Sequence, residues 1–213
     1  MNLLSENPIV IIVQFLALVL SIGFHEFSHV LAAYLQGDQT GKMLGRLTLN
    51  PIRHLDPYGT IFMVLSMLSG IGIGWGKPAP FNPYNLRFRR WGPVLVAFAG
   101  PISNILFATL AGYILLAVGP TLGPSNLLTI FLSYLTIWNA GLAIFNLIPV
   151  APLDGSHLVE AMFGPNNAFV QYMHRYGWMI LLFLIVFARD LIGTIISTGI
   201  HGILTGVGLG QLY

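Results

Sequence analysis

The chain has 213 residues, of which 55% are hydrophobic and only 8% are charged, with a net charge of +2. Soluble domains carry about 25% charged residues, so this composition excludes an ordinary soluble protein and indicates an integral protein of a lipid bilayer. The few basic residues lie in short segments between apolar runs, which argues against a nucleic-acid partner, and no nucleotide-binding motif is recognised. Cysteine is absent, so a metal site would have to use His, Asp or Glu.

Four apolar runs are long enough to cross a bilayer core, which takes about 20 helical residues. They cover residues 8–35, 91–118, 127–148 and 169–188. Residues 1–7 carry only Glu6 and no charged leader with a cleavage site, so we expect the first run to be retained. The sequence therefore predicts an all-α polytopic membrane protein, a bundle of about four to six transmembrane helices.

Residues 45–57, after the first run, do not have a helical pattern. Leu47, Leu49 and Ile52 partly alternate with polar residues, and Pro51 and Pro57 argue against a helix and against a central strand. We therefore expect a short membrane-associated β-hairpin or edge strand there. Farther along, residues 76–85 contain three prolines and predict an ordered, extended loop.

A shorter apolar run covers residues 58–75. Basic residues flank it on both sides: Lys42, Arg46 and Arg53 before it, and Lys77, Arg87, Arg89 and Arg90 after it. Because Lys and Arg mark the cytoplasmic side, both flanks should lie there, and the run should re-enter the membrane rather than cross it. Glycines at 70, 72, 74 and 76 fit irregular backbone at membrane depth. An ordinary short span is the alternative.

The same rule orients the chain. With the N-terminus outside, the first helix runs inward, and parity brings residues 154–165 near the cytoplasmic face. Residues 191–213 form either another span or an interfacial helix. We expect one membrane domain over residues 1–213, with a core at 8–155 and C-terminal helices at 169–213.

The first helix contains His25-Glu26-Phe27-Ser28-His29, an HExxH pattern. Two histidines four residues apart lie on one helix face and can hold one metal ion, with Glu26 beside them as a base. A carboxylate at membrane depth costs about 2.5–3.5 kcal/mol, so it normally faces an interior site or a wet cavity. The pattern therefore predicts a metal site, against the alternative that these residues cap the helix at the interface.

Catalytic zinc usually has three protein ligands, so a third is needed. Asp154 follows a membrane helix that parity brings to the same side as His25, and Pro149 and Pro152 break that helix just before it. Asp154 would complete the set; alternatively, it is a turn residue before Gly155.

Several motifs together resemble the site-2 proteases, which are intramembrane zinc metalloproteases. They are HEFSH at 25–29, AGPISN at 99–104 and NLIPVAPLDG at 146–155, with HLDPYGT at 54–60 and GWGKPAPFNP at 74–83 similar to the small prokaryotic branch. We see none of the PDZ and CBS domains or the extra leading helix of larger relatives. The resemblance implies one zinc ion per chain, held by His25, His29 and Asp154, with Glu26 as catalytic base. It also implies a location in a prokaryotic cell (inner) membrane. It also places Asn104 and Asn146 near the active site, as candidates to bind substrate or an oxyanion; helix packing is the alternative for Asn104.

These assignments imply hydrolysis of peptide bonds in or near transmembrane segments of membrane proteins, in regulated intramembrane proteolysis or clearance of signal-peptide remnants. Such a substrate must unwind locally, and an edge strand could pair with it. The candidates for this strand are Arg46, Leu47, Thr48, Leu49 and Asn50. The rival hypothesis is a non-catalytic metal-binding membrane protein, either a transporter or a pseudo-protease that binds partners.

Overall fold

The computed structural model describes residues 8–68 and 74–212, and the regular secondary structure of these residues is helical. In chain order the α-helices are α1 (Pro8–Leu35), α2 (Thr40–Met43), α3 (Pro57–Leu68), α4 (Gly92–Leu122), α5 (Leu127–Asn146), α6 (Ser156–Phe163), α7 (Ala168–Phe187) and α8 (Arg189–Gly206). Short 3₁₀ helices occur at η2 (Pro51–His54), η3 (Pro83–Asn85) and η4 (Gly210–Leu212). Four helices, α1, α4, α5 and α7, are long and apolar enough to cross a membrane, as predicted. The chain is therefore a multi-pass membrane protein.

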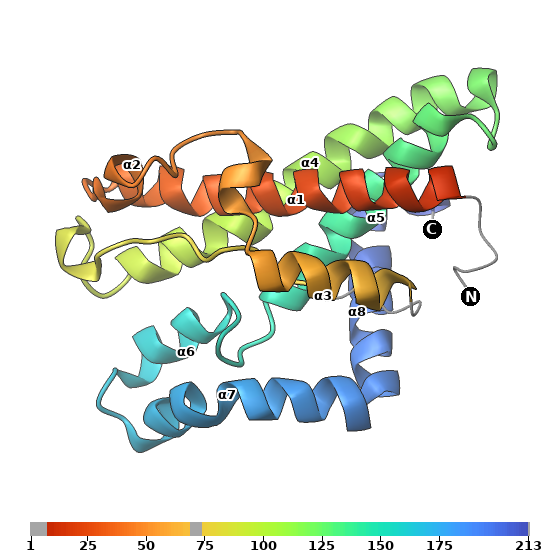
Figure 1. Cartoon of the computed structure of the whole chain (residues 1–213). Helices are drawn as coiled ribbons and strands as arrows, with labels where there is room; N and C mark the ends of the chain where they lie inside the picture. The colour runs from red at the N-terminus through yellow and green to blue at the C-terminus, as the bar shows by residue number, and fades with distance from the viewer. Residues whose placement is uncertain (1–7, 69–73, 213) are drawn as a thin grey trace.

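Helices α1, α4 and α5 pack together as the core of the molecule (Figure 1). Small side chains at their contacts, such as Ala17, Ala108, Ala111 and Ala140, are fully buried. Small residues let helix backbones approach closely, which is how helices associate where lipid supplies no hydrophobic driving force. This close packing gives the rigid support on which a site can be built.

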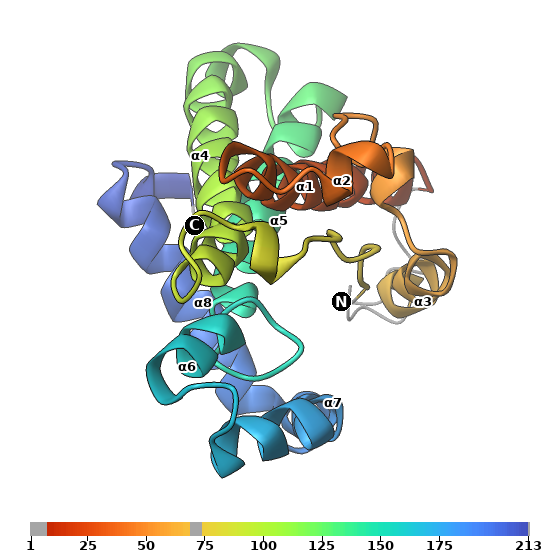
Figure 2. The ribbon, with the colours of Figure 1, turned by 90° about the vertical axis from the view of Figure 1, so that its left-hand side faces the viewer.

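The C-terminal part forms an arm beside this core. Helix α7 lies apart from α1, and α6 and α8 connect it to the rest (Figures 1 and 2). Only Ala188 separates the end of α7 from Arg189, the first residue of α8, and α8 turns away from α7 at a steep angle (Figure 1) to pack on α5. Helix α8 is not among the described helices apolar enough to count as spans.

The predicted β-hairpin or edge strand at residues 46–50 is wrong, since these residues form bends leading into η2. Polar side chains turn the backbone here. Thr48 Oγ1 accepts from Asn50 N at 3.2 Å, and Asn50 Oδ1 accepts from Ile52 N at 3.1 Å, capping η2 with Pro51 at its first position. Such local bonds offer the backbone an alternative to a strand ladder. Among the described residues no β-strand occurs, only one isolated antiparallel bridge, between Leu55 and Gly76.

That bridge joins the two ends of the short apolar run predicted to re-enter. Lys77 N also donates to His54 O at 2.7 Å, so the chain leaves this run beside the point where it began. Helix α3 has 12 residues. It is therefore about 18 Å long, too short for a core of about 30 Å. Gly70 and Gly72 lie outside the described residues.

Candidate active site

The structure brings the three predicted metal ligands together. His25 and His29, one turn apart on α1, are 6% and 5% exposed, and their Nε2 atoms lie 2.9 Å apart. Asp154 Oδ2 lies 3.2 Å from His25 Nε2 and 3.4 Å from His29 Nε2. The two histidines and Asp154 thus meet at one point, although they are far apart in the sequence.

A tight turn after α5 aims Asp154 at α1. Gly155 N donates to Asn146 O at 2.7 Å, which folds the chain back onto the end of α5. A Cβ at Gly155 would collide with the carbonyl oxygens of Leu147 and Ile148, so only glycine fits. Beyond the turn, Arg90 Nε donates to Ala161 O at 2.8 Å and ties α6 to the start of α4.

A chain of hydrogen bonds fixes which nitrogen of His25 carries the proton. Asn139 Nδ2 must face Leu135 O, 2.7 Å away, because a carbonyl only accepts. Asn139 Oδ1 then accepts from Asn104 Nδ2 at 2.9 Å, which turns Asn104 Oδ1 toward His25 Nδ1 at 2.6 Å. His25 therefore donates from Nδ1.

His29 is oriented by the same logic, because its Nδ1 lies 2.8 Å from the carbonyl oxygen of Val96. With both Nδ1 atoms donating, the neutral rings present lone pairs at Nε2, and these converge with Asp154 Oδ2. That oxygen is buried and accepts no hydrogen bond within the described residues. Three electron-rich atoms so close repel one another, and a shared cation removes the repulsion.

Space for such an ion comes from Gly100 on α4. A Cβ there would lie 2.5 Å from His29 Nε2 and 2.6 Å from His25 Cε1. Two imidazole nitrogens and one carboxylate oxygen form a typical donor set for catalytic zinc, which leaves a further position open for water.

A cavity of about 730 Å³ opens beside these atoms. Its polar lining includes Glu26, His25, His29, Asp154 and Asn146. The remaining wall is mostly apolar and includes residues of the segment 74–81 and of α7. Glu26 Oε2 is buried and makes no hydrogen bond within the described residues, so a carboxylate faces the cavity next to the ligands. The cavity thus combines a metal-binding set, a base and room for an apolar segment.

Comparison with known proteins agrees with this geometry. Residues 109–187 match the model of "Peptidase family M50". The chain is 37% identical over 190 residues to "Putative zinc metalloprotease YwhC" of Bacillus subtilis, covering 86% of this chain and 82% of that protein. The chain belongs to peptidase family M50. It is therefore a zinc metallopeptidase of the site-2 protease type, and the predicted zinc cofactor is confirmed.

More distant M50 relatives include "Putative zinc metalloprotease Rip2" of Mycolicibacterium smegmatis, which is 25% identical over 172 residues, with 79% of this chain and 64% of that protein covered. The Mycobacterium tuberculosis protein of the same name is 28% identical over 152 residues, with 70% of this chain and 56% of that protein covered. The chain thus spans less than two thirds of these longer relatives. No solved structure matches it.

The structure separates the two asparagines that M50 resemblance placed near the active site. Asn146 lines the cavity, and its Nδ2 donates to Leu142 O at 3.0 Å, which leaves Oδ1 available. Asn104 is fully buried behind His25 and is not among the described residues that line the cavity. Sequence reasoning missed its partner Asn139, although an amide in the middle of an apolar helix was a usable signal.

The candidate substrate segment of this M50 chain lies next to the site but is not extended. Arg46 is only 5% exposed, and its Nη2 donates to Lys77 O at 2.6 Å. Thr48 O lies 2.7 Å from His54 Nε2, while Leu49 is 63% exposed. The side chain of Arg46 thus supports residues 74–81, and it is this latter segment that lines the cavity.

Proposed function

We propose that this chain is an intramembrane zinc metalloprotease that uses Glu26 as its base and holds zinc through His25, His29 and Asp154. The observation that carries the proposal is the convergence of three ligand atoms beside Glu26, on the wall of a cavity between membrane helices. A transporter or pseudo-protease is less well supported, because the family is proteolytic and the base is present with every ligand.

His25, His29 and Asp154 would hold zinc there, and the ion would supply Lewis acidity toward the scissile carbonyl and toward a water molecule. Glu26 then accepts the proton of the attacking water and delivers it to the departing amide nitrogen. Asn146 Oδ1 accepts a hydrogen bond from the substrate backbone at the cavity wall. His25 is kept in the ligating tautomer by Asn104, which acts behind the site rather than on the substrate.

An unwound substrate would pair with residues 74–81 rather than with residues 46–50. Gly76 already bridges Leu55 along one edge of this segment, and Pro78 and Pro80 favour extended backbone. The backbone N–H and C=O of Ala79 make no hydrogen bond within the described residues. A Cβ at Gly76 would lie 3.3 Å from Glu26 Cγ, so the segment runs directly past the base. An added strand would therefore present its peptide bonds to the metal.

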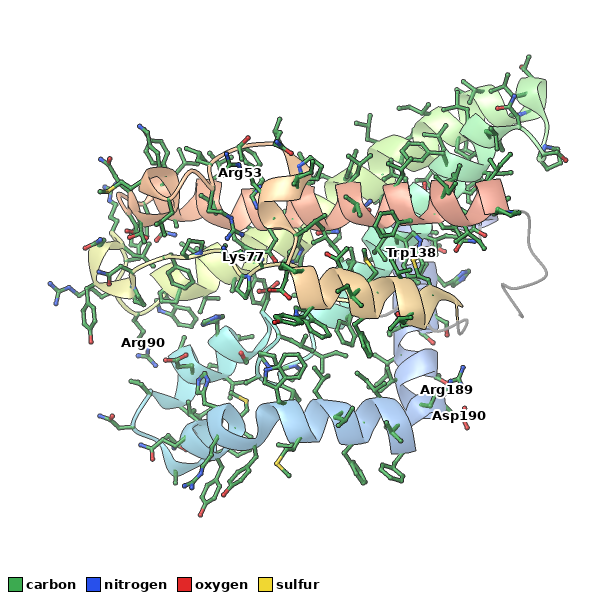
Figure 3. The ribbon with its side chains drawn as sticks, viewed as in Figure 1. Arg53, Lys77, Arg90, Trp138, Arg189 and Asp190 are labelled. Atoms are coloured by element: carbon green, nitrogen blue, oxygen red, sulfur yellow. The ribbon has the colours of Figure 1, made fainter. Side chains whose placement is uncertain are left out.

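The charges favour an active site nearer the cytoplasm. Arg53, Lys77 and Arg90 lie toward the C-terminal half of α1, away from Arg189 and Asp190 (Figure 3). By the positive-inside rule this half faces the cytoplasm and the N-terminus lies outside. The short run containing α3 then enters and leaves on the cytoplasmic side. The substrates we propose are single-pass membrane proteins or signal-peptide remnants in a bacterial cell membrane.

The test uses the purified chain in lipid vesicles with a model single-pass substrate. We expect one zinc ion per chain by elemental analysis, cleavage inside or next to the membrane segment, loss of cleavage with a chelator, and recovery with added zinc. Glu26→Gln should retain zinc and lose about 10²–10⁴-fold in kcat. Cleavage by Glu26→Gln at the wild-type rate would refute the proposed mechanism, and full zinc content in Asp154→Asn would remove Asp154 from the ligand set.

A further inference from the structure

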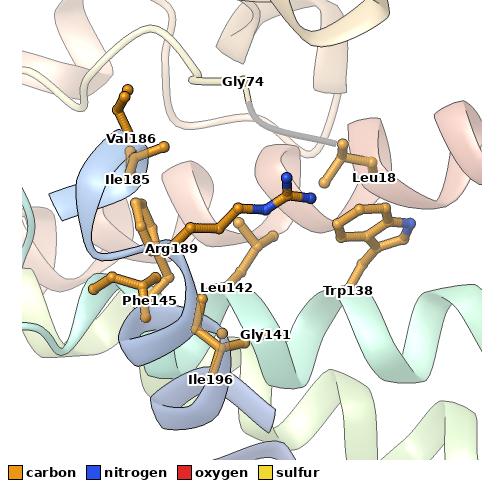
Figure 4. Close-up of a pocket in the computed structure, with 12 residues that line it drawn as sticks. Leu18, Gly74, Trp138, Gly141, Leu142, Phe145, Ile185, Val186, Arg189 and Ile196 are labelled. Carbon is orange, nitrogen blue, oxygen red and sulfur yellow. The ribbon is translucent and has the colours of Figure 1, made fainter. Parts of the chain in front are cut away.

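A second cavity adjoins the active-site cavity. Its volume is about 470 Å³, within the range of about 300–1,000 Å³ typical of ligand sites. Side chains from α1, α5, α7 and α8 line it (Figure 4). Gly74, Leu142, Phe145 and Ile185 line both cavities. A segment bound at the metal site can therefore continue into the second cavity.

The described residues that line this second cavity are apolar except for Arg189 and the indole N–H of Trp138. Among the described residues that line it, Arg189 is the one with a charge, and its side chain points across the cavity toward Leu18 and Trp138 (Figure 4). Arg189 makes no ion pair or hydrogen bond with the described residues. A guanidinium group always carries its charge and has five N–H donors, so this arginine lacks an anionic partner.

The stability of α8 does not explain this arginine. Arg189 is the first residue of α8, where the positive end of the helix dipole disfavours a cation. Asp190 in the same turn has the favourable sign. Arg189 is exposed, and its side chain points across the cavity between apolar side chains (Figure 4). The guanidinium group is therefore accessible to a ligand that enters the cavity.

The cavity lies deep along α1. Leu18 is ten positions after Pro8, so it lies about 15 Å from the start of the helix. It is also seven positions before His25, about 10 Å along the axis. An extended chain advances about 3.3–3.6 Å per residue. A side chain about three residues from the cleaved bond would therefore reach Arg189.

We propose that Arg189 is a specificity-determining residue, which recognises a carboxylate on the substrate about three residues from the cleaved bond, on the side toward the N-terminal end of α1. This inference rests on the proposed protease function and names its preferred substrates, membrane segments with one Asp or Glu near the cleavage point. Such a carboxylate is costly in lipid and gains a charge-assisted, bidentate partner in the enzyme. A preference for Asp or Glu thus selects membrane segments that the carboxylate already makes less stable in the bilayer.

The experiment varies both charges. A model single-pass substrate whose cleaved bond is mapped by mass spectrometry receives Glu, Gln or Lys in turn at each of two to four residues on either side. Each substrate is offered in vesicles of neutral lipid to wild type, Arg189→Met and Arg189→Glu. Arg175→Met is the matched control, because Arg175 stacks over Tyr176 on α7 and lines neither cavity among the described residues.

For wild type we expect Glu at one position to raise kcat/KM about tenfold over Gln, as a charge-assisted hydrogen bond should. Arg189→Met should lose this preference, and Arg189→Glu should reverse it in favour of Lys, with zinc content unchanged in both. Arg175→Met should keep the wild-type preference. The rescue of a Lys substrate by Arg189→Glu cannot come from a fold defect, which would lower every rate.

Two results would overturn the inference. The first is an equal preference for Glu over Gln in wild type and Arg189→Met. The second comes from repeating the assay with phosphatidylglycerol in the vesicles. If Arg189→Met then lowers cleavage of the Glu, Gln and Lys substrates equally, and leaves substrate preference unchanged in neutral vesicles, Arg189 binds an anionic lipid instead. Failure of the protease function looks different: neither wild type nor any variant would cleave any substrate.

Discussion

The two walls of the active-site cavity are built differently. On the metal wall, His25, Asn104 and Asn139 are almost completely buried, and side chains on α1, α4 and α5 connect them by hydrogen bonds. On the opposite wall, Trp178 and Met179 of α7 are 59% and 67% exposed, and the extended segment 74–81 has unpaired backbone at Ala79. The metal ligands must be held firmly to bind zinc. The opposite wall would bind substrates with different side chains, and unpaired backbone groups can pair with the backbone of any of them.

The largest expected effect is at the metal wall, with Gly100→Ala. The new Cβ would lie 2.5 Å from His29 Nε2, and the helix backbone cannot move aside without disturbing α4. We expect zinc content to fall well below one ion per chain and cleavage to be lost, as measured by elemental analysis and the vesicle assay.

Gly119→Ala is the matched control in the same helix. A Cβ there meets only Leu115 Cδ1, at an ordinary 3.5 Å. This variant should bind zinc and cleave like wild type. Full zinc content in Gly100→Ala would contradict the prediction, because the imidazoles of His25 and His29 could then move aside without losing the metal.

The second prediction concerns Asn139, which is two hydrogen bonds away from a ligand. In Asn139→Leu the amide of Asn104 loses its acceptor and is free to rotate, so His25 is no longer held in the ligating tautomer. Loss of such support costs about 10- to 100-fold in metal affinity. Competition with a fluorescent zinc chelator measures this change.

Asn126→Ala provides a comparison within α5. Asn126 Oδ1 caps the helix by accepting from Leu128 N at 2.9 Å, and loss of a cap costs about 1 kcal/mol of stability. This variant should unfold at a lower temperature with unchanged zinc affinity. If Asn139→Leu behaves in the same way, the hydrogen-bond chain is only structural.

These two predictions show how much of the site the sequence could supply. The spacing of His25, Glu26 and His29 is a local helical property, and the motif around Asp154 contains its own turn, so both were predictable. The role of Asn139 depends on which faces of α1, α4 and α5 meet, and no short pattern contains that information. Gly100 entered the sequence analysis only as part of AGPISN at 99–104, and the closeness of both imidazoles to it follows from the same helix crossing.

The fold shows the same division. Long apolar helices were predicted because length and composition decide them. The strand at residues 46–50 was wrong because alternation in a short segment is weak evidence, and side-chain caps from Thr48 and Asn50 decided the conformation instead. The position of a loop relative to a cavity depends on tertiary packing. The wall formed by α7 and residues 74–81, which we call the substrate wall, was therefore the least predictable part of the molecule.

A smaller effect is expected on the substrate wall, with Ala79→Pro. This change removes one backbone N–H from a segment that already suits proline, because Pro80 keeps residue 79 extended. If the substrate pairs there, loss of one hydrogen bond at about 0.5–1.5 kcal/mol lowers kcat/KM about two- to tenfold, mainly through KM. Zinc affinity should not change. Ala79→Gly keeps the N–H and is the control; equal kcat/KM in the two variants would argue against pairing at this residue.

The smallest expected effect is at Asp38, which anchors the far end of the substrate wall. This carboxylate is 1% exposed and accepts from Thr40 Oγ1 at 2.6 Å and from Asn82 N at 2.8 Å. Burial opposes its ionisation, but the hydrogen bonds from Thr40, Asn85 and Asn82 lower its pKa below the usual value. Because the folded-state pKa is the lower one, ionised Asp38 stabilises the fold above its unfolded pKa of about 3.9, and the contribution is lost as pH falls through the folded value.

Asp38→Asn should therefore lower the unfolding temperature at pH 7, and its difference from wild type should shrink below about pH 4. Thermal unfolding in detergent at the two pH values measures this. A looser anchor at Asn82 should also raise KM modestly, by less than the change expected for Ala79→Pro, with zinc content unchanged. If Asp38→Asn instead lost zinc, a change at the wall formed by α7 and residues 74–81 would affect the metal wall. The segment 74–81 would then take part in holding the metal ligands.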